Sequence, residues 1–436
     1  MVAVLLYRCT VPLPWLYMRV GGLGGLELSD PALIGLLIGV LLNPRSITFP
    51  GQKWLWGVVC WYAISSAYTF FFGFNDSRRS DALNEFIRYG LSYVIPVAIV
   101  LASRQERKWL VRCCFLVAGL CCLLQSYIIT SGDYNFFIRH GLIDPSRSAD
   151  VDSVIQIGGM YKISFQGLLL TVAVFFFCLS SILMHWQEIG AGRWFLLPLT
   201  FGCSLAIYSF RSKSLMVLVG IGLLALLVTP GRALGNRVLM AILLLGALAL
   251  GLRIVESRSE MNFLTETFDR FRSDTAEWDV GSVGSRIGDN IRAVELVGRY
   301  PLFGIGRPDL TLGGDILSEG MPAFDWQGYD AHALLMLAVF IGLPGAVMAA
   351  LALTGLMAQI PWMQLGRASW TAGGCVCGFS ALVALGMGNA VPVLTQRPEL
   401  TAFMVFWGLA LAEVPNLADY RGVKNSKVKH CHPTSE

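Results

Sequence analysis

The chain has 436 residues, of which 55% are hydrophobic and 14% are charged, and its formal net charge is +4. With a mean hydropathy of +0.60 it has too little polar surface to cover a water-soluble globule of this length. Its basic residues are spread along the chain and do not collect into a face for nucleic acid, so the composition predicts a polytopic membrane protein.

Long aliphatic runs predict helices that cross the bilayer, because roughly 20 apolar residues span its hydrocarbon core. A transmembrane barrel would need alternating hydrophobicity, which the sequence lacks. We therefore expect an all-α membrane bundle of about twelve transmembrane helices. The expected spans are 2–20, 30–43, 54–73, 86–102, 109–130, 160–184, 194–209, 213–229, 236–254, 332–358, 370–390 and 399–414. Glycines and Pro44 flank the second of them, so one of the first two is a candidate for a tilted or re-entrant segment.

The N-terminal segment is expected to be the first span and not a signal peptide. Arg8 interrupts its apolar run and no small-residue cleavage site follows. Most of the 11 cysteines fall within expected spans, where buried small hydrophobes explain them better than disulfides or metal ligands do. Cys375 and Cys377 lack the spacing and the partner cluster of a zinc site. We expect no metal and no other cofactor.

The distribution of arginine and lysine predicts the orientation of the chain. Short, mostly basic loops at 44–53, 103–109, 185–193, 230–237 and 359–369 share a side with the basic C-terminal tail. The other side receives the turn around Arg211 and the long loop 255–331, in which acidic residues outnumber basic ones. The positive-inside rule therefore predicts that both termini are cytoplasmic and that this loop lies outside.

These assignments divide the chain into an N-terminal transmembrane bundle (1–254), a large outer loop (255–331), C-terminal transmembrane helices (332–414) and a basic cytoplasmic tail (415–436). Within the loop, Ser285 can cap a helix that Pro301 ends. Its apolar residues recur every three or four positions, which predicts an amphipathic helix lying on the membrane or on the bundle. They are Ile287, Ile291, Val294 and Val297.

Residues 281–345 join this charged helix to a hydrophobic span, with His332 at the junction. This layout resembles the C-terminal signature of the O-antigen ligase and polymerase superfamily. The matching residues are Gly284, Arg286, Pro301, Gly304, Gly306, Ala331, His332, Gly342, Leu343 and Gly345. The asparagine that usually follows the histidine is replaced here by Ala333. Arg211 fits an outward-facing arginine of the same family, except that its serine neighbour, Ser212, follows it instead of preceding it.

The resemblance implies an all-α fold like that of lipid-sugar-dependent glycosyltransferases, in a bacterial inner membrane with the large loop in the periplasm. The implied activity is a metal-independent polymerase that joins polyprenyl-pyrophosphate-linked oligosaccharide repeat units into exopolysaccharide or O-antigen. Its expected partners are this lipid-linked oligosaccharide, membrane lipid, and other polysaccharide assembly and export proteins, with no nucleic acid.

Three residues are expected to carry the chemistry. A guanidinium between two spans, as at Arg211, is costly unless it has a partner or a function. Arg286 begins a helix, where backbone N–H groups and the dipole favour an anion. In the family's terms both arginines would hold the donor pyrophosphate, and His332 would contact or deprotonate the acceptor hydroxyl. The plainer interpretation is that Arg211 and His332 merely contact lipid headgroups.

Three further residues are expected to contribute to substrate binding. Arg292 lies on the same helix as Arg286, but Asp289 and Glu295 flank it at i−3 and i+3 and would neutralise it on a solvated face. Asp330 can orient the ring of His332 or be an ordinary exposed carboxylate. Tyr329 precedes it at the point where the polar loop becomes a span.

Three alternatives make different demands on the sequence. Asp150 and Asp152 form a DxD pattern that holds a divalent metal in many nucleotide-sugar transferases, but the expected topology puts them outside, where nucleotide sugars are not supplied. A ligase that transfers finished glycan to lipid A core shares the proposed chemistry, and the sequence does not separate it from a polymerase. A translocator should carry charges deep in several spans, and often two related halves, for which the sequence gives little support.

Overall fold

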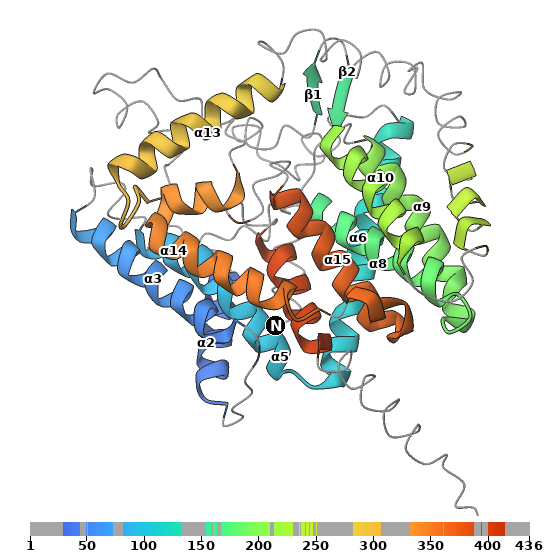
Figure 1. Cartoon of the computed structure of the whole chain (residues 1–436), viewed down its shortest axis with the longest axis horizontal. Coiled ribbons are helices and arrows are strands. Elements are labelled where there is room, and N and C mark those ends of the chain that lie inside the picture. The colour runs from blue at the N-terminus through green and yellow to red at the C-terminus, as the bar shows by residue number, and fades with distance from the viewer. Residues whose placement is uncertain are drawn as a thin grey trace, which may run out of the picture.

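The computed structural model is a bundle of helices with one small β-hairpin (Figure 1). It describes residues 29–43, 49, 51–72, 82–131, 154–157, 160–163, 167–209, 213–229, 235, 237–239, 241–243, 245–246, 250, 282–306, 332–360, 362–387, 394 and 400–414. Within these residues, six helices are long and apolar enough to cross a membrane, and three shorter apolar helices accompany them. The expected multi-pass helical membrane protein is thereby confirmed. The total of twelve spans and the division into four parts stay predictions.

The described elements are given in chain order, and the expected span 86–102 consists of a π-helix, a 3-10 helix and a short α-helix. They are α2 (Ser29–Leu41), α3 (Gln52–Phe72), the π-helix η2 (Phe86–Gly90), the 3-10 helix η3 (Leu91–Val94), α5 (Ile95–Leu101), α6 (Arg104–Ser131), β1 (Val154–Ile157), β2 (Met160–Ile163), α8 (Leu168–His185), η5 (Gly190–Gly192), α9 (Arg193–Ser209), α10 (Lys213–Val228), α13 (Ser282–Arg299), α14 (Ala333–Met357), η7 (Trp362–Arg367), α15 (Trp370–Met387) and a last helix Leu400–Val414.

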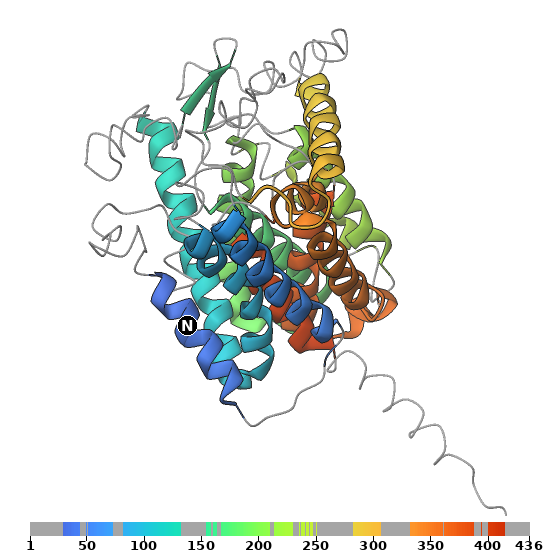
Figure 2. The same ribbon diagram turned by 90° about the vertical axis from the view of Figure 1, so that its left-hand side faces the viewer.

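The hairpin β1–β2 corrects one expected span. Residues 160–163 pair antiparallel with 154–157, and the following helix begins at Leu168 instead of 160. The sequence signal was present: β-branched Val154, Ile155 and Ile157 favour a strand, and the two glycines that follow are typical of tight hairpin turns. In both views α13 and the hairpin lie at the same end of the bundle (Figures 1 and 2), which we call the α13 end.

Helix α8 forms the centre of the bundle, because every one of its residues is buried. Helix α15 approaches it closely at two glycines. A Cβ on Gly374 would lie 2.7 Å from the ring of Phe177, and one on Gly378 would lie 2.7 Å from the carbonyl oxygen of Ala173. Small residues therefore allow the two helices to pack backbone to side chain without lipid between them.

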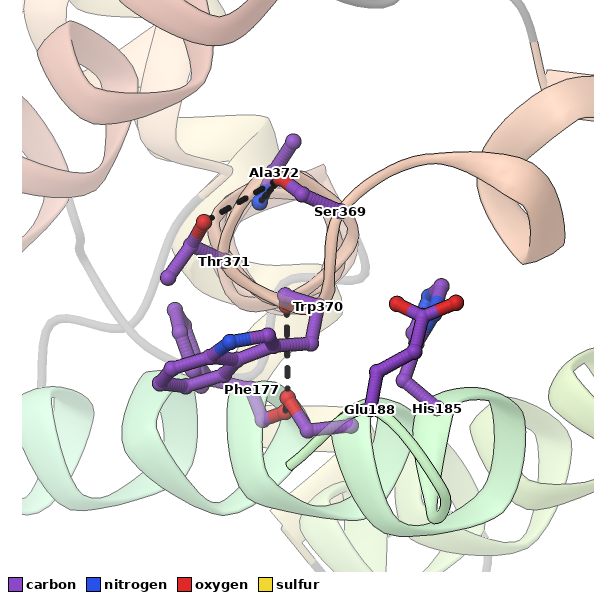
Figure 3. A network of polar contacts seen from close by, with 8 residues as sticks. Phe177, His185, Glu188, Ser369, Trp370, Thr371 and Ala372 are labelled. Carbon is purple, nitrogen blue, oxygen red and sulfur yellow. Dashed lines mark hydrogen bonds and ion pairs between the residues drawn. The ribbon is translucent and has the colours of Figure 1, made fainter. Parts of the chain in front are cut away.

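A polar cluster joins α8 to the start of α15 (Figure 3). The hydroxyl of Ser181 donates to the carbonyl of Trp370 at 3.4 Å, and the Trp370 ring packs edge-on against Phe177 at 5.8 Å. At the end of α8, Nδ1 of His185 lies 3.2 Å from a carboxylate oxygen of Glu188. The other end of α15, at Met387, reaches His332, so the two described histidines lie at opposite ends of the bundle.

Candidate functional site

His332 forms the junction between the α13 end and the membrane bundle. It is the N-cap of α14, and its carbonyl accepts the first helical hydrogen bond, from the N–H of Met336 at 2.9 Å. Its own N–H donates to Oδ1 of Asn290, on α13, also at 2.9 Å. The first turn of α14 and the middle of α13 are therefore tied together at the histidine that the sequence singles out.

The imidazole of His332 is half-buried, and its environment favours the neutral form. Burial lowers the pKa of His332 below its ordinary value, because the charged ring loses solvation, and an interaction with the main chain of Met387 opposes this in part. A neutral imidazole can accept a proton. The position thus combines partial exposure with the protonation state that a general base needs at neutral pH.

Residues Pro301–Gly306 form a strap that packs against α14. The strap pairs with it by main-chain hydrogen bonds: Ile305 N–H donates to the carbonyl of Val339 at 2.8 Å, and Gly306 N–H donates to the carbonyl of Phe340 at 3.0 Å. The sequence predicted that Pro301 ends the preceding helix, and α13 does end at Arg299. It did not predict that the strap binds a transmembrane helix.

The strap can bind there because α14 is broken at Gly342, which has φ 84° and ψ 169°. Such a break frees carbonyls before it and N–H groups after it, and Pro344 cannot donate at all. The carbonyl of Ile341 accepts from the indole N–H of Trp61 at 2.8 Å, and the N–H of Leu343 donates to the carbonyl of Pro301 at 2.8 Å. Non-helical backbone inside a membrane bundle is stable only with such internal partners.

Helix α3 holds the strap from the other side. The hydroxyl of Ser65 donates to the carbonyl of Phe303 at 2.7 Å. The ring of Phe303 is stacked against Trp61 at 5.6 Å and against Tyr68 at 4.4 Å between centroids. Offset aromatic pairs of this kind add about 0.5–1.5 kcal/mol each beyond simple burial. The strap therefore follows α13 in the chain and is held against both α3 and α14.

Two glycines of the strap have positive φ, 68° at Gly304 and 69° at Gly306. A Cβ on Gly304 would lie 2.5 Å from the carbonyl oxygen of Val339, so only glycine allows the backbones to meet. A Cβ on Gly306 would lie 3.3 Å from Thr69 and 3.7 Å from a carboxylate oxygen of Glu85. The last residue of the strap thus lies beside a carboxylate that the sequence analysis did not single out.

Helix α13 begins at Ser282 and not at Ser285, so the expected cap position is wrong by one turn, and Arg286 is the fifth residue of the helix instead of lying at its start. Its expected apolar stripe divides into two faces. Val297 is buried against the bundle, together with Ala293 and Leu296, whereas Ile291 and Val294 are exposed. One face of the helix packs on α14, as expected for a helix lying on the bundle. The partner of the opposite, exposed face stays a prediction.

The remaining sequence-predicted site residues are described only in part. Arg286 and Arg292 are residues of α13, and their side chains lie outside the described part of the chain. Arg286 precedes Asn290 by four residues, so helical periodicity puts the two positions on the same face. The others lie outside the described residues; they are Arg211, Tyr329, Asp330, Asp150 and Asp152. Among the residues that are described, no group of three histidine, cysteine or acidic side chains could hold a metal.

The structure adds residues that the sequence analysis missed. Asn290 is one of them: it lies three residues before Ala293, on the face of α13 that the structure shows to be buried, and its contact with His332 has no local sequence signal. Arg88 is a second case: its Nε lies 3.2 Å from Oδ2 of Asp30, which is fully buried. Its sequence signal is an arginine within a hydrophobic span, which is costly without a partner.

Neither a comparison with models of protein families nor a search of curated proteins finds a match for this chain. The candidate site therefore stands on its own geometry: a half-buried histidine at the mouth of a broken transmembrane helix, beside a helix that carries two of the predicted arginines.

Proposed function

We propose that the protein is a bacterial inner-membrane polymerase that joins polyprenyl-pyrophosphate-linked oligosaccharide repeat units at the periplasmic face. The observation that supports this best is the hydrogen bond between the N–H of His332 and Oδ1 of Asn290. It brings together the two separate halves of the sequence motif, the arginine-bearing helix and the histidine at the membrane. The proposed mechanism needs these two elements to lie close together.

The proposed reaction is a direct glycosyl transfer. The acceptor is a sugar hydroxyl of one lipid-linked unit, and its oxygen attacks the anomeric carbon of the donor unit. The bond between that carbon and the phosphate oxygen breaks, and polyprenyl pyrophosphate leaves with the bonding electrons. His332 takes the hydroxyl proton; its lowered pKa keeps the ring neutral, and so able to accept a proton, before the reaction, although the same shift makes the ring a weaker base. Arg286 and Arg211 neutralise the leaving pyrophosphate, because guanidinium groups can bind phosphate in a bidentate way.

The experiment that tests the proposal is reconstitution of the purified full-length protein with a lipid-linked repeat unit from its own operon. We expect a ladder of polymers that remain attached to polyprenyl pyrophosphate, with wild-type protein and not with His332→Ala. Arg104→Gln, at the start of α6, is a matched control at a site unrelated to the reaction.

Two results would contradict the proposal. Transfer that occurs only when lipid A core is added, and produces no ladder before it, would identify a ligase. Vesicles that take up the lipid-linked unit or the polymer without forming any new glycosidic bond would identify a translocator.

A further inference from the structure

A second candidate site lies at the opposite end of the bundle from α13, at the start of α6 and α9. It is independent of the proposed enzymatic function and requires only that the protein spans a membrane. Here the guanidinium of Arg112 lies 5.1 Å from the ring centroid of Trp109, and that of Arg193 lies 5.4 Å from Trp186 and 5.7 Å from Trp194. Both arginines therefore lie over indole rings at this end.

The two arginines lie at matching depth, because α6 and α9 pack side by side in parallel. Sγ of Cys122 lies 3.7 Å from Sγ of Cys203, and Nε2 of Gln125 donates to the carbonyl of Ala206 at 3.3 Å; each pair is separated by 81 residues. The same offset pairs position 112 with Arg193. The rings of Phe115 and Phe195 are 6.3 Å apart, so the helices stay together toward this end.

An apolar stripe runs from Arg112 toward the middle of the membrane. Its residues follow Arg112 at helical spacing, and each is more than half exposed on the surface of the bundle; they are Leu116, Leu120 and Leu123. On α9, Phe195 is also more than half exposed. The surface therefore matches the two parts of a phospholipid. Its cations and indoles can contact a headgroup, and its aliphatic side chains can contact the acyl chains.

The acidic side chains near this surface have other partners. A carboxylate oxygen of Glu106 accepts from the N–H of Ser103 at 2.7 Å, as in a capping box, and Glu188 faces His185. The basic residues at this end, Arg104, Arg107, Lys108, Arg112 and Arg193, also outnumber these two carboxylates, so the surface has a net positive character. Guanidinium groups bind phosphate strongly, and exposed indoles favour the headgroup level of a membrane.

We propose that this surface binds an anionic phospholipid, with Arg112 at the phosphate and the stripe above it along the acyl chains. Basic positions between transmembrane helices are known to select acidic headgroups, which the hydrophobic effect alone does not do. Arg193, between Trp186 and Trp194, supplies a second cation at the same depth on the neighbouring helix. In the proposed orientation this is the cytoplasmic leaflet.

The test is native mass spectrometry of the full-length protein in detergent, with phosphatidylglycerol and phosphatidylcholine titrated separately. We expect phosphatidylglycerol to bind more tightly, and Arg112→Gln to weaken it about tenfold, as for the loss of a charge-assisted hydrogen bond. Arg112→Lys should recover part of the loss. Arg104→Gln, an exposed charge on the same helix for which the described residues provide no indole contact, is the matched control, and inorganic phosphate alone should not compete.

Equal binding of the two lipids would overturn the proposal, and so would an equal effect of Arg104→Gln, which would indicate general charge attraction. Competition by inorganic phosphate would identify a site for the free ion. Because Arg112 is exposed, the melting temperature of Arg112→Gln without added lipid should match wild type, which separates lost binding from misfolding.

Discussion

Gly342 of α14 and Leu302 of the strap approach so closely that a Cβ on Gly342 would lie 1.8 Å from the Leu302 carbonyl oxygen. The contact exists because α14 is broken at this glycine and the strap supplies hydrogen-bond partners to both sides of the break. Any other residue at position 342 must move the strap, and the strap connects α13 to α3 and α14. The glycine therefore controls where α13 lies relative to the bundle.

The first prediction is that Gly342→Ala destabilises the protein by roughly 2–4 kcal/mol, from positive-φ strain together with the overlap. Thermal unfolding in detergent measures this as a lower melting temperature. Gly39→Ala is the matched control, because its added Cβ would meet nothing within 4 Å. Equal melting temperatures for the two variants would show that the strap does not depend on this glycine.

The second prediction concerns Asn290. Asn290→Ala removes the acceptor for the N–H of His332, which should cost about 0.5–1.5 kcal/mol of stability and lower turnover by displacing α13. Asn290→Asp keeps an acceptor oxygen and should recover most of the turnover. Glu295→Ala changes an exposed position of the same helix and serves as the control. If Asn290→Ala and Glu295→Ala had equal rates, Asn290 would have no role in positioning the site.

The third prediction concerns the protonation of His332. Because its pKa is lowered, the neutral form persists below pH 6.5, and the rate should fall only as the pH decreases through this lowered value. His332→Ala should abolish this acidic limb, bind lipid-linked donor normally, and reduce the rate by about 10²–10⁴. Rates and donor binding are measured at matched protein abundance. A near-normal rate for His332→Ala would show that His332 is not a general base, and the interpretation that it only contacts lipid headgroups would then hold.

The fourth prediction separates the arginines from the histidine. Arg286→Lys and Arg211→Lys keep the charge and lose the planar fork, so donor binding should weaken and turnover should fall without either being abolished. Arg299→Lys, in the last turn of α13, is the control. Unchanged donor affinity in both variants would mean that the pyrophosphate binds elsewhere.

The fifth prediction is topological. Reporters fused after residue 275 or 320 should be active outside the cytoplasm, and those fused after 234 or at the C-terminus should be active inside it. If the fusions at 275 and 320 were active inside, the site would lie on the wrong side of the membrane for a flipped lipid-linked substrate, and the proposed mechanism would fail.

The sequence by itself determined that this is a helical membrane protein, because burial in lipid requires long apolar runs whose backbone bonds are satisfied within each helix. It also located α13 and its end before Pro301, since amphipathic spacing and proline act over a few residues. Both signals are local, and local signals can be read along the chain. The misplaced start of α8 shows the limit, since apolar residues of β2 merged with the following span in the hydropathy pattern.

Only the tertiary structure decided how the site is built. The Gly342–Pro344 segment is one apolar stretch in the sequence, and its break becomes stable only because Trp61 and the strap, far away in the chain, provide hydrogen-bond partners. The link between Asn290 and His332, and the pairing of Arg88 with Asp30, likewise join separate elements. Such contacts depend on which unsatisfied polar groups meet inside the bundle, because hydrocarbon offers them no alternative partner.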